Sequence, residues 1–435
     1  MNEVLTDKDS NLINVLVFPS CNYPGLEIIE AIIKHPRINV FGGSSIGSKL
    51  DRSYALLKRN YFFIPNIDDD KFYKSMHGLC KEHSIDIVFP TVDAVIALMA
   101  SWSGQDFSVI APSANLANLA LYKSKIYKAL FGKIPLPNMY SNDMSYPVFA
   151  KPDIGSGSNG IRKIDSYLEY DRLNKEGMMI QEYLPGHEYT VDCISDLDGL
   201  LISYNVRLRS QIYAGSSHAT SCIEHTEIGE NIKIIACNLR LSGPWFAQFK
   251  LDKENVPKLM EVNARIAGSS GASRLSGFNI PLMSVLLFSG YSITAPRKIA
   301  SVSINKENRL SGDIDDFNWV IWDLDDTITS STGVVDPDIV AWLYRFNNSG
   351  KLQLLLSKNH NPKKVIKELK IPNFFIDIIC ASDKKLSLKK IFSKYSMNTS
   401  DTVMINDSNS EKSLILHEYP MLRWVAPDAI NVFKR

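Results

Sequence analysis

Strand and helix patterns alternate at both ends of this chain, and a region dominated by strand patterns lies between them. Near the N-terminus, apolar strand runs at 14–18, 40–41 and 85–89 end in turn residues, and apolar residues at helical spacing follow the first and third. The alternation resumes at residue 319 and continues to the C-terminus. Short β-α-β connections predict open parallel sheets, so we expect two α/β units with a different domain between them.

At 435 residues the chain is too long for one ordinary core, and two or three domains are expected. Its 48 Lys and Arg residues nearly cancel its 47 Asp and Glu residues, which argues against nucleic acid and membranes as partners. The six cysteines are scattered without a C-x-x-C pair, as is typical of free thiols in a reducing compartment. Residues 1–11 do not have the pattern of a signal peptide, and apolar runs such as 280–288 are too short to cross a bilayer. A cytoplasmic protein is expected.

The middle of the chain begins with a helical pattern at about 116–131 and then turns to strands. Strand patterns occur at 148–151, 179–183, 189–194, 200–204, 245–249 and 258–263. After residue 291 the sequence becomes polar and loses its periodicity, which indicates a linker. The predicted division is an α/β domain at 1–115, a strand-rich domain at 116–300, a linker at 301–317 and a second α/β domain at 318–435.

A lysine at the end of a predicted strand precedes a glycine-rich loop, residues 155–160. Lys151 is followed by three glycines and two serines within this loop: Gly155, Ser156, Gly157, Ser158 and Gly160. Backbone N–H groups and hydroxyls of such a loop can fold over phosphate oxygens while the lysine supplies positive charge. A Gly/Ser-rich hairpin turn without a ligand has the same composition, so the loop alone leaves both readings open.

Polar side chains gather on two further pairs of predicted strands. Glu182 and Glu188 lie at strand ends, where they could accept hydrogen bonds from an adenine amine and ribose hydroxyls or simply face water. Gln248 lies on a later strand, and Glu261 and Asn263 share one face of the next because side chains alternate along a strand. Such oxygen ligands suit Mg²⁺, whereas a buried hydrogen-bonded network is the structural alternative.

Taken in order, these features resemble the ATP-grasp superfamily, most closely the branch of carbamoyl-phosphate synthase large subunits and carboxylate–amine ligases. The resemblance covers about residues 12–289 and includes the run Phe89-Pro90-Thr91-x-Asp93. It is carried by Lys123, Lys151 with its loop, Glu182, Glu188, Gln248 and the Glu261-x-Asn263-x-Arg265 run. The chain departs from the family in having Ala264 where proline is usual, whereas Gln248 rather than a carboxylate at the first metal position is similar to the carbamoyl-phosphate synthase branch.

The resemblance implies an ATP-grasp fold with a lid subdomain at about 135–190, and ATP and Mg²⁺ as cofactors. It implies that Lys123 and Lys151 contact phosphates under the glycine-rich loop, and that Glu182, the backbone of Tyr183 and Leu184, and Glu188 hold adenine and ribose. It further implies Mg²⁺ at Gln248, Glu261 and Asn263, and a charge-stabilising role for Arg265 in phosphoryl transfer. The implied activity is ADP-forming ligation of a small-molecule carboxylate to an amine through an acyl phosphate.

Two arginines are candidates for binding the substrate. Arg207 and Arg209 would share one strand face before Gly215, and arginine suits bidentate carboxylate binding. The run 268–271, Gly-Ser-Ser-Gly, is either a backbone anion site or an ordinary turn.

The C-terminal region places acidic and polar residues at several strand ends. A strand at 319–322 runs into Asp323-x-Asp325, and a second strand ends at Ser357. Two carboxylates spaced in this way put a nucleophile beside a general acid/base. Lys384 and Lys385 follow, and then Asp407 and Glu411. Single acidic groups at strand ends are often only solvated, but polar residues at several successive strand ends are not typical of solvated ends and indicate a site.

This set resembles the haloacid dehalogenase (HAD) superfamily over about residues 318–435, with a Rossmann-like domain and minimal cap. The resemblance implies Asp323 as nucleophile and Asp325 as general acid/base. It also implies phosphoryl contacts from Ser357 and from Lys384 or Lys385, and a magnesium set of Asp323, Asp325 and Asp407 supported by Glu411.

The leading interpretation is a bifunctional enzyme, a ligase with a phosphatase, in biosynthesis or tailoring of a small metabolite or surface polysaccharide. Because 357–359, Ser-Lys-Asn, is similar to HAD proteins that load glyceryl groups, acyl or glyceryl transfer to a carrier protein is the alternative. A homodimer or a carrier protein would be the macromolecular partner. A non-catalytic assembly protein is disfavoured because both polar sets are complete.

Overall fold

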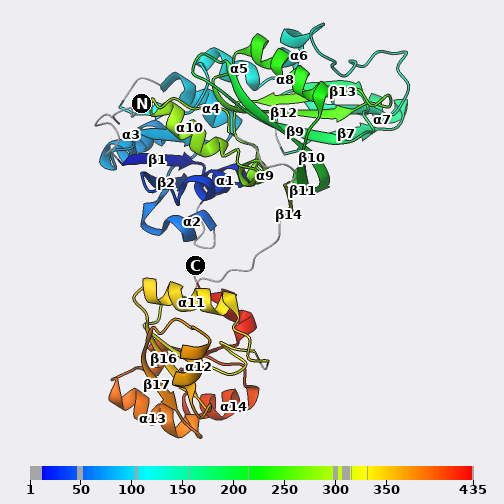
Figure 1. Ribbon diagram of the computed structural model, residues 1–435. Coiled ribbons are helices and arrows are strands. Elements are labelled where there is room, and N and C mark those ends of the chain that lie inside the picture. The colour runs from blue at the N-terminus through cyan, green and yellow to red at the C-terminus, as the bar shows by residue number, and fades with distance from the viewer. Residues whose placement is uncertain are drawn as a thin grey trace, which may run out of the picture. The chain divides into compact units, whose positions relative to one another are not determined.

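The computed structural model describes residues 12–46, 52–102, 106–155, 157–213, 215–296, 302–305, 314, 316–330 and 332–433. The chain divides into two compact units, Met1–Glu307 and Asn308–Arg435, and each is described by itself (Figure 1). No helix in the described ranges is long and apolar enough to cross a membrane.

Unit 1 begins with a five-stranded parallel sheet in the order β3-β2-β1-β4-β5. Val15, Leu16 and Val17 of the central strand are completely buried, which is why this strand reads as an uninterrupted apolar run. The parallel sheet predicted from the alternating pattern is therefore present. Its elements are β1 (Ile13–Phe18), α1 (Tyr23–Ile32), β2 (Ile38–Ser44), α2 (Arg52–Leu57), β3 (Tyr61–Phe63), α3 (Phe72–Glu82), β4 (Ile87–Pro90), α4 (Asp93–Met99) and β5 (Ser108–Val109).

Two helices replace the single helix predicted at 116–131, so that prediction is wrong in its continuity. They are α5 (Ala114–Ala120) and α6 (Lys123–Leu130). Tyr122 between them has an extended backbone, with φ −107° and ψ 114°, and this residue breaks the helical hydrogen-bond ladder. The break lets the backbone N–H of Lys123 donate to Asp153 O at 3.2 Å, so α6 starts beside the glycine-rich loop.

An antiparallel six-stranded sheet, in the order β13-β12-β9-β10-β11-β14, forms the body of the strand-rich region. A smaller sheet, β7-β6-β8, stands beside it in the region expected to be a lid. The larger sheet holds β9 (Glu188–Ser195), β10 (Leu201–Tyr213), β11 (Ser216–Ile223), β12 (Gly243–Leu251), β13 (Pro257–Asn263) and β14 (Ser303–Asn305). The remaining elements are β6 (Val148–Pro152), β7 (Arg162–Ile164), α7 (Tyr167–Asp171), β8 (Met178–Glu182), α8 (Thr226–Leu239), α9 (Gly271–Leu275) and α10 (Ile280–Phe288).

The predicted boundary at residue 300 falls too early. Strand β14 pairs with β11 through Ala219–Asn305, Thr220–Ile304 and Ser221–Ser303, so part of the expected linker belongs to the sheet. Its sequence is short and polar because it is an edge strand, with little side-chain surface to bury, and periodicity therefore gave no signal.

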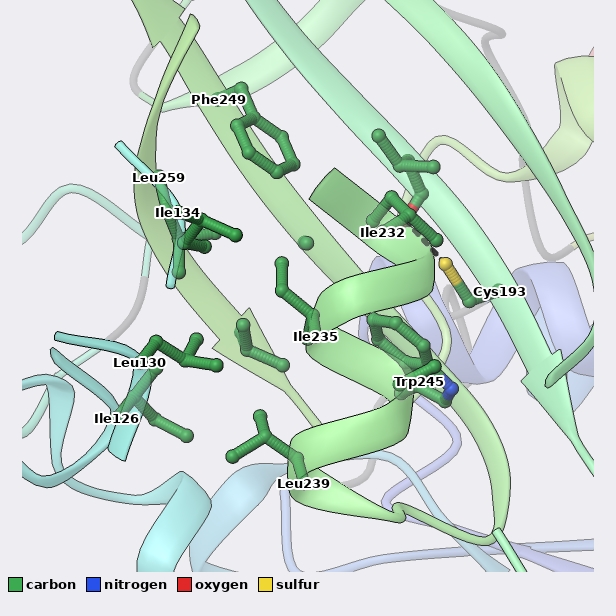
Figure 2. Close-up of a cluster of buried hydrophobic side chains, with 14 of the residues drawn as sticks. Ile126, Leu130, Ile134, Cys193, Ile232, Ile235, Leu239, Trp245, Phe249 and Leu259 are labelled. Carbon is green, nitrogen blue, oxygen red and sulfur yellow. Dashed lines mark hydrogen bonds between the residues drawn. The ribbon is translucent and has the colours of Figure 1, made fainter. Parts of the chain in front are cut away.

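Helix α8 closes one face of the large sheet. Ile228, Ile232, Ile235 and Leu239 recur at helical spacing and are buried. Figure 2 shows this face of α8 meeting Trp245 and Phe249 of β12 and Ile126 and Leu130 of α6. A second core joins the N-terminal sheet to the segment after β13, because Ile28 and Ile29 of α1 cluster with Phe278 and Val285. The N-terminal sheet is thereby packed firmly against the strand-rich region.

Unit 2 is a five-stranded parallel sheet in the order β17-β16-β15-β18-β19. The central strand β15 is flanked by β16 and β18, so the carboxyl ends of these three strands meet at one edge. Between β15 and α11 the described residues form only isolated bridges, which leaves no cap domain there. The elements are β15 (Trp319–Trp322), α11 (Pro337–Asn348), β16 (Leu352–Ser357), α12 (Pro362–Glu368), β17 (Phe375–Cys380), α13 (Lys384–Lys394), β18 (Thr402–Ile405), α14 (Asn409–Glu418) and β19 (Arg423–Val425).

The separate cores predict two unfolding transitions that respond to different substitutions. Ile235→Ala removes a fully buried side chain from the core of unit 1 and should lower the free energy of unfolding of that unit by about 3 kcal/mol. The unit 2 transition should not move. Urea unfolding followed by circular dichroism checks this, with Leu200→Ala, a residue 52% exposed, as the matched control. Equal losses in the two variants would contradict the assignment of this core.

Candidate functional site

A cavity of about 850 Å³ opens in unit 1, where the N-terminal sheet, α6, the glycine-rich loop and the antiparallel sheet meet. Among the described residues, five cationic side chains and three carboxylates line it, and this excess of positive charge suits a polyanion. They are Lys123, Lys151, Arg209, Lys250 and Arg265 against Asp93, Glu188 and Glu261.

Lys151 is buried in the wall of this cavity, with only 4% of its surface exposed. It lies near the end of β6 and donates from Nζ to the hydroxyl of Tyr127 at 2.9 Å and to Met260 O at 2.8 Å. Both acceptors are uncharged. Burial therefore lowers the pKa of Lys151 to about 7, although the charge of Glu261 acts in the opposite direction. Such an ammonium gains most from an incoming anion.

The glycine-rich loop is tied to the start of α6. Lys123 donates from Nζ to Gly155 O at 2.8 Å, and the carboxylate of Asp153 accepts from the backbone N–H and hydroxyl of Ser124 at 2.7 and 2.6 Å. Gly157, Ser158 and Gly160 all have left-handed backbones. Of the predicted loop residues, Gly155, Gly157 and Ser158 line the cavity, Gly160 packs beside Pro152, and Ser156 lies outside the described residues.

The residues expected to hold adenine do not line the cavity. The carboxylate of Glu182 is engaged by Lys258 at 2.5 Å and by the backbone N–H of Asn138 at 2.8 Å. The ring of Tyr183 faces the ammonium of Lys163 at 5.4 Å, and Leu184 is buried. The expectation for this group therefore has no support from the cavity geometry.

Glu188, the expected ribose contact, does line the cavity but is already paired. It forms an ion pair with Arg209 and a longer one, 3.9 Å, with Lys250. Arg209 also donates to Gln248 Oε1 at 3.3 Å. Arg209, a candidate for binding the substrate, thus lies in the cavity wall, where it already binds the carboxylate of Glu188 and the side-chain amide of Gln248.

Two of the three expected magnesium ligands come together. Gln248 and Glu261 are register partners across β12 and β13, and both line the cavity. Their oxygens are of the type that Mg²⁺ prefers. Asn263 is 8% exposed, is not a lining residue, and has a buried amide nitrogen that finds no hydrogen-bond partner among the described residues. No group of three Asp, Glu, His or Cys side chains in the described ranges forms a metal site, so the fit rests on Gln248 and Glu261.

Arg265 reaches the cavity from the strand-rich region but is anchored by the N-terminal sheet. Its Nε donates to both carboxylate oxygens of Asp93, at 3.0 and 3.1 Å. Its guanidinium also lies over the ring of Phe246, 5.0 Å from the centroid. Asp93 begins α4 just after β4, so a contact across 172 residues of sequence fixes this arginine.

Arg207 was expected to contact the substrate, but the structure does not place it in the cavity. It is fully buried and forms a bidentate pair with Asp192, at 2.6 and 2.8 Å, and donates to Ser269 Oγ at 2.9 Å. Its charge is neutralised inside the domain, and only Ser269 of this group lines the cavity. Arg207 therefore belongs to a buried network that supports the turn at 268–271.

Several lining residues came from parts of the sequence without a recognised pattern. Asn22 and Tyr23 follow β1, and Thr190 and Lys250 lie on β9 and β12. The signal for the first two was available, because the turns after parallel strands form the binding edge of such sheets. Tyr127, which accepts from Lys151, gave no signal because it reads as one apolar position of α6.

Unit 2 brings together a compact set of charges at the carboxyl edge of its sheet. Asp323 follows β15 and pairs with Lys384 at 2.6 Å, and Lys384 pairs with Glu411 at 2.9 Å. Burial raises the pKa of Asp323 to about 6 against the opposing effect of Lys384. Burial would raise the pKa of Glu411, but hydrogen bonds from Lys358, Lys384 and Asn406 lower it.

Of the other residues predicted for the site of unit 2, some lie at the carboxyl edge of the sheet and one lies on the surface. Asp325 accepts from Ser357 Oγ at 3.5 Å and from Asn359 Nδ2 at 3.1 Å, while Thr327 Oγ1 donates to Asp407 at 3.4 Å.

Lys385, in contrast, pairs with Glu418 on the surface at 2.8 Å, so Lys384 is the lysine of the site. Asp323, Asp325 and Asp407 do not converge as three carboxylates, since no such cluster exists in the described ranges. The carboxylate of Asp325 is turned toward Ser357 and Asn359 instead.

Comparisons with known proteins agree with the ATP-grasp resemblance. Residues 174–309 match a family model described as ATP-grasp in the biosynthetic pathway with Ter operon. No curated protein matches the sequence.

Many solved structures resemble the chain, and three of them illustrate the likeness. The biotin carboxylase domain of 2-oxoglutarate carboxylase from Hydrogenobacter thermophilus, solved as a dimer with MgADP, ADP and bicarbonate, is 14% identical with a TM-score of 0.56 and covers 66% of this chain and 72% of its own. N5-carboxyaminoimidazole synthetase from Staphylococcus aureus, solved with ADP, is 14% identical with a TM-score of 0.54, covering 67% and 81%. L-amino acid ligase from Bacillus licheniformis is 16% identical with a TM-score of 0.53, covering 70% and 82%. At these identities the likeness concerns the fold.

The burial of Lys151 predicts a stabilising substitution. Because its pKa falls from 10.5 to about 7 in the fold, folding disfavours the protonated lysine, and this penalty is complete below pH 7 and disappears as the pH approaches 10.5. Lys151→Met should therefore raise the free energy of unfolding at pH 7 by about 2 kcal/mol, and the gain should shrink at alkaline pH. Thermal unfolding between pH 6 and 10 checks this, with exposed Lys128→Met as control. A destabilised Lys151→Met variant would contradict it.

Proposed function

We propose that unit 1 is an ATP-dependent carboxylate–amine ligase that forms an acyl phosphate and releases ADP. The observation that carries the proposal is the meeting of Lys151 with Gln248 and Glu261 on one cavity whose lining carries excess positive charge. The fold likeness to an amino acid ligase and to a synthetase solved with ADP supports it.

ATP and Mg²⁺ fit the residues that line this cavity. Lys123 and Lys151 would hold phosphate oxygens, and Gln248 and Glu261 would hold the ion, which supplies electrophilic neutralisation of the phosphates. On binding ATP, the ammonium of Lys151 would gain a phosphate anion as a partner in place of the neutral Tyr127 hydroxyl and Met260 carbonyl. This interaction would offset the free-energy cost of burying the charge. Adenine contacts at Glu182, Tyr183 and Leu184, a third metal contact at Asn263 and a loop contact at Ser156 rest on the family resemblance alone.

The cavity wall provides the remaining requirements of acyl-phosphate chemistry. Arg265, which Asp93 holds in the cavity wall, would supply positive charge to the phosphoryl oxygens as the carboxylate oxygen attacks phosphorus. The phosphoryl–oxygen bond to the leaving diphosphate breaks as the new acyl–oxygen–phosphorus bond forms. The amine then attacks the acyl carbon, and phosphate leaves. Since water competes with the amine for that carbon, the loop over the site must exclude it.

Ligase activity predicts a specific pattern of products and variants. ATP turnover against amino acids and sugar acids should yield ADP and phosphate, and hydroxylamine should trap the acyl phosphate. Lys151→Met and Glu261→Gln should each lower kcat/KM at least about a hundredfold, whereas exposed Lys128→Met should match the wild type. Formation of AMP and pyrophosphate instead would overturn the acyl-phosphate route.

We further propose that unit 2 is a magnesium-dependent phosphohydrolase of the HAD type. Its support is the arrangement of Asp323, Lys384 and Glu411 beside Asp325 and Ser357 at one sheet edge. Asp323 would attack phosphorus while Asp325 gives its proton to the leaving oxygen, and water would then cleave the aspartyl phosphate as Asp325 takes a proton back. Mg²⁺ would be held by Asp323 and Asp407 and would neutralise charge on the phosphoryl group.

Substitution of the two adjacent lysines, one at a time, distinguishes a specific role in the site from a general effect of lost positive charge. Lys384→Met should abolish phosphatase activity toward small phosphate esters, because it removes the cation between Asp323 and Glu411. Lys385→Met, which loses only a surface pair with Glu418, should retain it. Asp323→Asn should abolish the phosphatase while leaving ligation of an unphosphorylated substrate intact. Labelling of a carrier protein by a phosphorylated acyl donor, without phosphatase turnover, would favour acyl or glyceryl transfer instead.

A further inference from the structure

The tip of the β10–β11 hairpin lies directly against the glycine-rich loop. Gly215, at this tip, has φ +73°, and a Cβ built there would lie 2.7 Å from Ser158 Cβ and 3.0 Å from the carbonyl carbon of Gly157. The 2.7 Å contact is closer than real carbon atoms approach, and the 3.0 Å contact with backbone is tighter than ordinary van der Waals contact. The backbone of the hairpin therefore packs directly on Ser158 and Gly157 of the loop, with no room for a side chain at residue 215.

Arg209 connects this contact to the nucleotide side of the cavity. Its guanidinium donates to Gly215 O at 2.6 Å, to the carboxylate of Glu188, and to Gln248 Oε1 at 3.3 Å. These partners belong to the hairpin tip, β9 and β12 respectively. Because the side chain of Arg209 is only 5% exposed, its planar fork fixes the three partners relative to one another.

The glycine-rich loop is thus held at two points. Lys123 of α6 holds its first residue through Gly155 O at 2.8 Å, and Gly215 supports its middle at Gly157 and Ser158. The first hold uses a lysine that a phosphate would recruit, so an incoming phosphate competes for it. The second hold is a packing contact rather than a hydrogen bond from a cation, so a phosphate bound by the loop does not compete for it, and it can persist when the cavity is filled.

We infer that Gly215 and Arg209 are positioning residues that keep the glycine-rich loop closed over the cavity. The loop packs on Gly215, and Arg209 connects Gly215 to Glu188 and Gln248. This inference rests on the proposed ligase function. Closure in this form makes water exclusion depend on the hairpin rather than on the loop alone. It also assigns Arg209 to the support of the site, in place of direct substrate binding.

The chain offers a matched pair of glycines for the test. Gly215→Ala introduces both left-handed backbone strain and a clash with the loop. Gly132→Ala introduces the same strain, at φ +70°, but meets nothing within 4 Å. MgADP binding by calorimetry should weaken about tenfold in Gly215→Ala and stay within about twofold of the wild type in Gly132→Ala. Protection by MgADP of the exposed Arg162–Lys163 site from trypsin should be lost only in Gly215→Ala.

A second variant keeps the test valid if Gly215→Ala folds poorly. Arg209→Lys preserves the positive charge beside Glu188 but cannot form the fork to Gly215 O. It should raise the share of ATP hydrolysed without ligated product about tenfold, with a smaller change in KM for ATP, which a purely structural loss would not produce. Equal protection and affinity in Gly215→Ala and Gly132→Ala would overturn the positioning role while leaving the ligase. Absence of MgADP binding in the wild-type protein would overturn both.

Discussion

The buried ammonium of Lys151 is the feature on which the chemistry of unit 1 depends. Its neighbours offer a hydroxyl and a carbonyl, so the fold tolerates a cation there without neutralising it. Such a site is expensive for a protein to maintain, and it is meaningful only where a charged ligand restores the balance. The elements around it are arranged accordingly: α6 breaks away from α5 to start beside the loop, and β13 turns the carbonyl of Met260 inward while Glu261 lines the same cavity.

Much of this arrangement could be predicted because it follows from local patterns. The alternation of strands and helices predicts both parallel sheets, and the period of two along β13 indicates that polar side chains would gather there. The resemblance to the ATP-grasp superfamily implied that Lys151, Glu261 and Asn263 approach one cavity; the first two line it, and Asn263 does not. These features depend on the direction in which a side chain points, and direction is encoded within a few residues of the chain.

The features that escaped prediction depend on distant partners. Nothing near Arg207 in the sequence indicates that Asp192 neutralises it, and nothing near Glu182 indicates Lys258. In the same way, Lys384 and Lys385 are adjacent and chemically identical, and only the different directions of their side chains from α13 separate a site residue from a surface one. A single sequence indicates which residues could do the chemistry, whereas the packed structure decides which of them are already occupied.

The short strand β14 has a practical meaning for anyone who wishes to separate the two units. It hydrogen-bonds along β11 through residues 303–305, beyond the point at which the polar character of the sequence suggests an interdomain tether. A shortened chain that stops at residue 300 would leave the backbone of β11 bare, and bare edges recruit strands from neighbouring molecules. Cleavage after residue 305 would keep β14 hydrogen-bonded to the edge of β11, so the two units should be divided there to remain monodisperse.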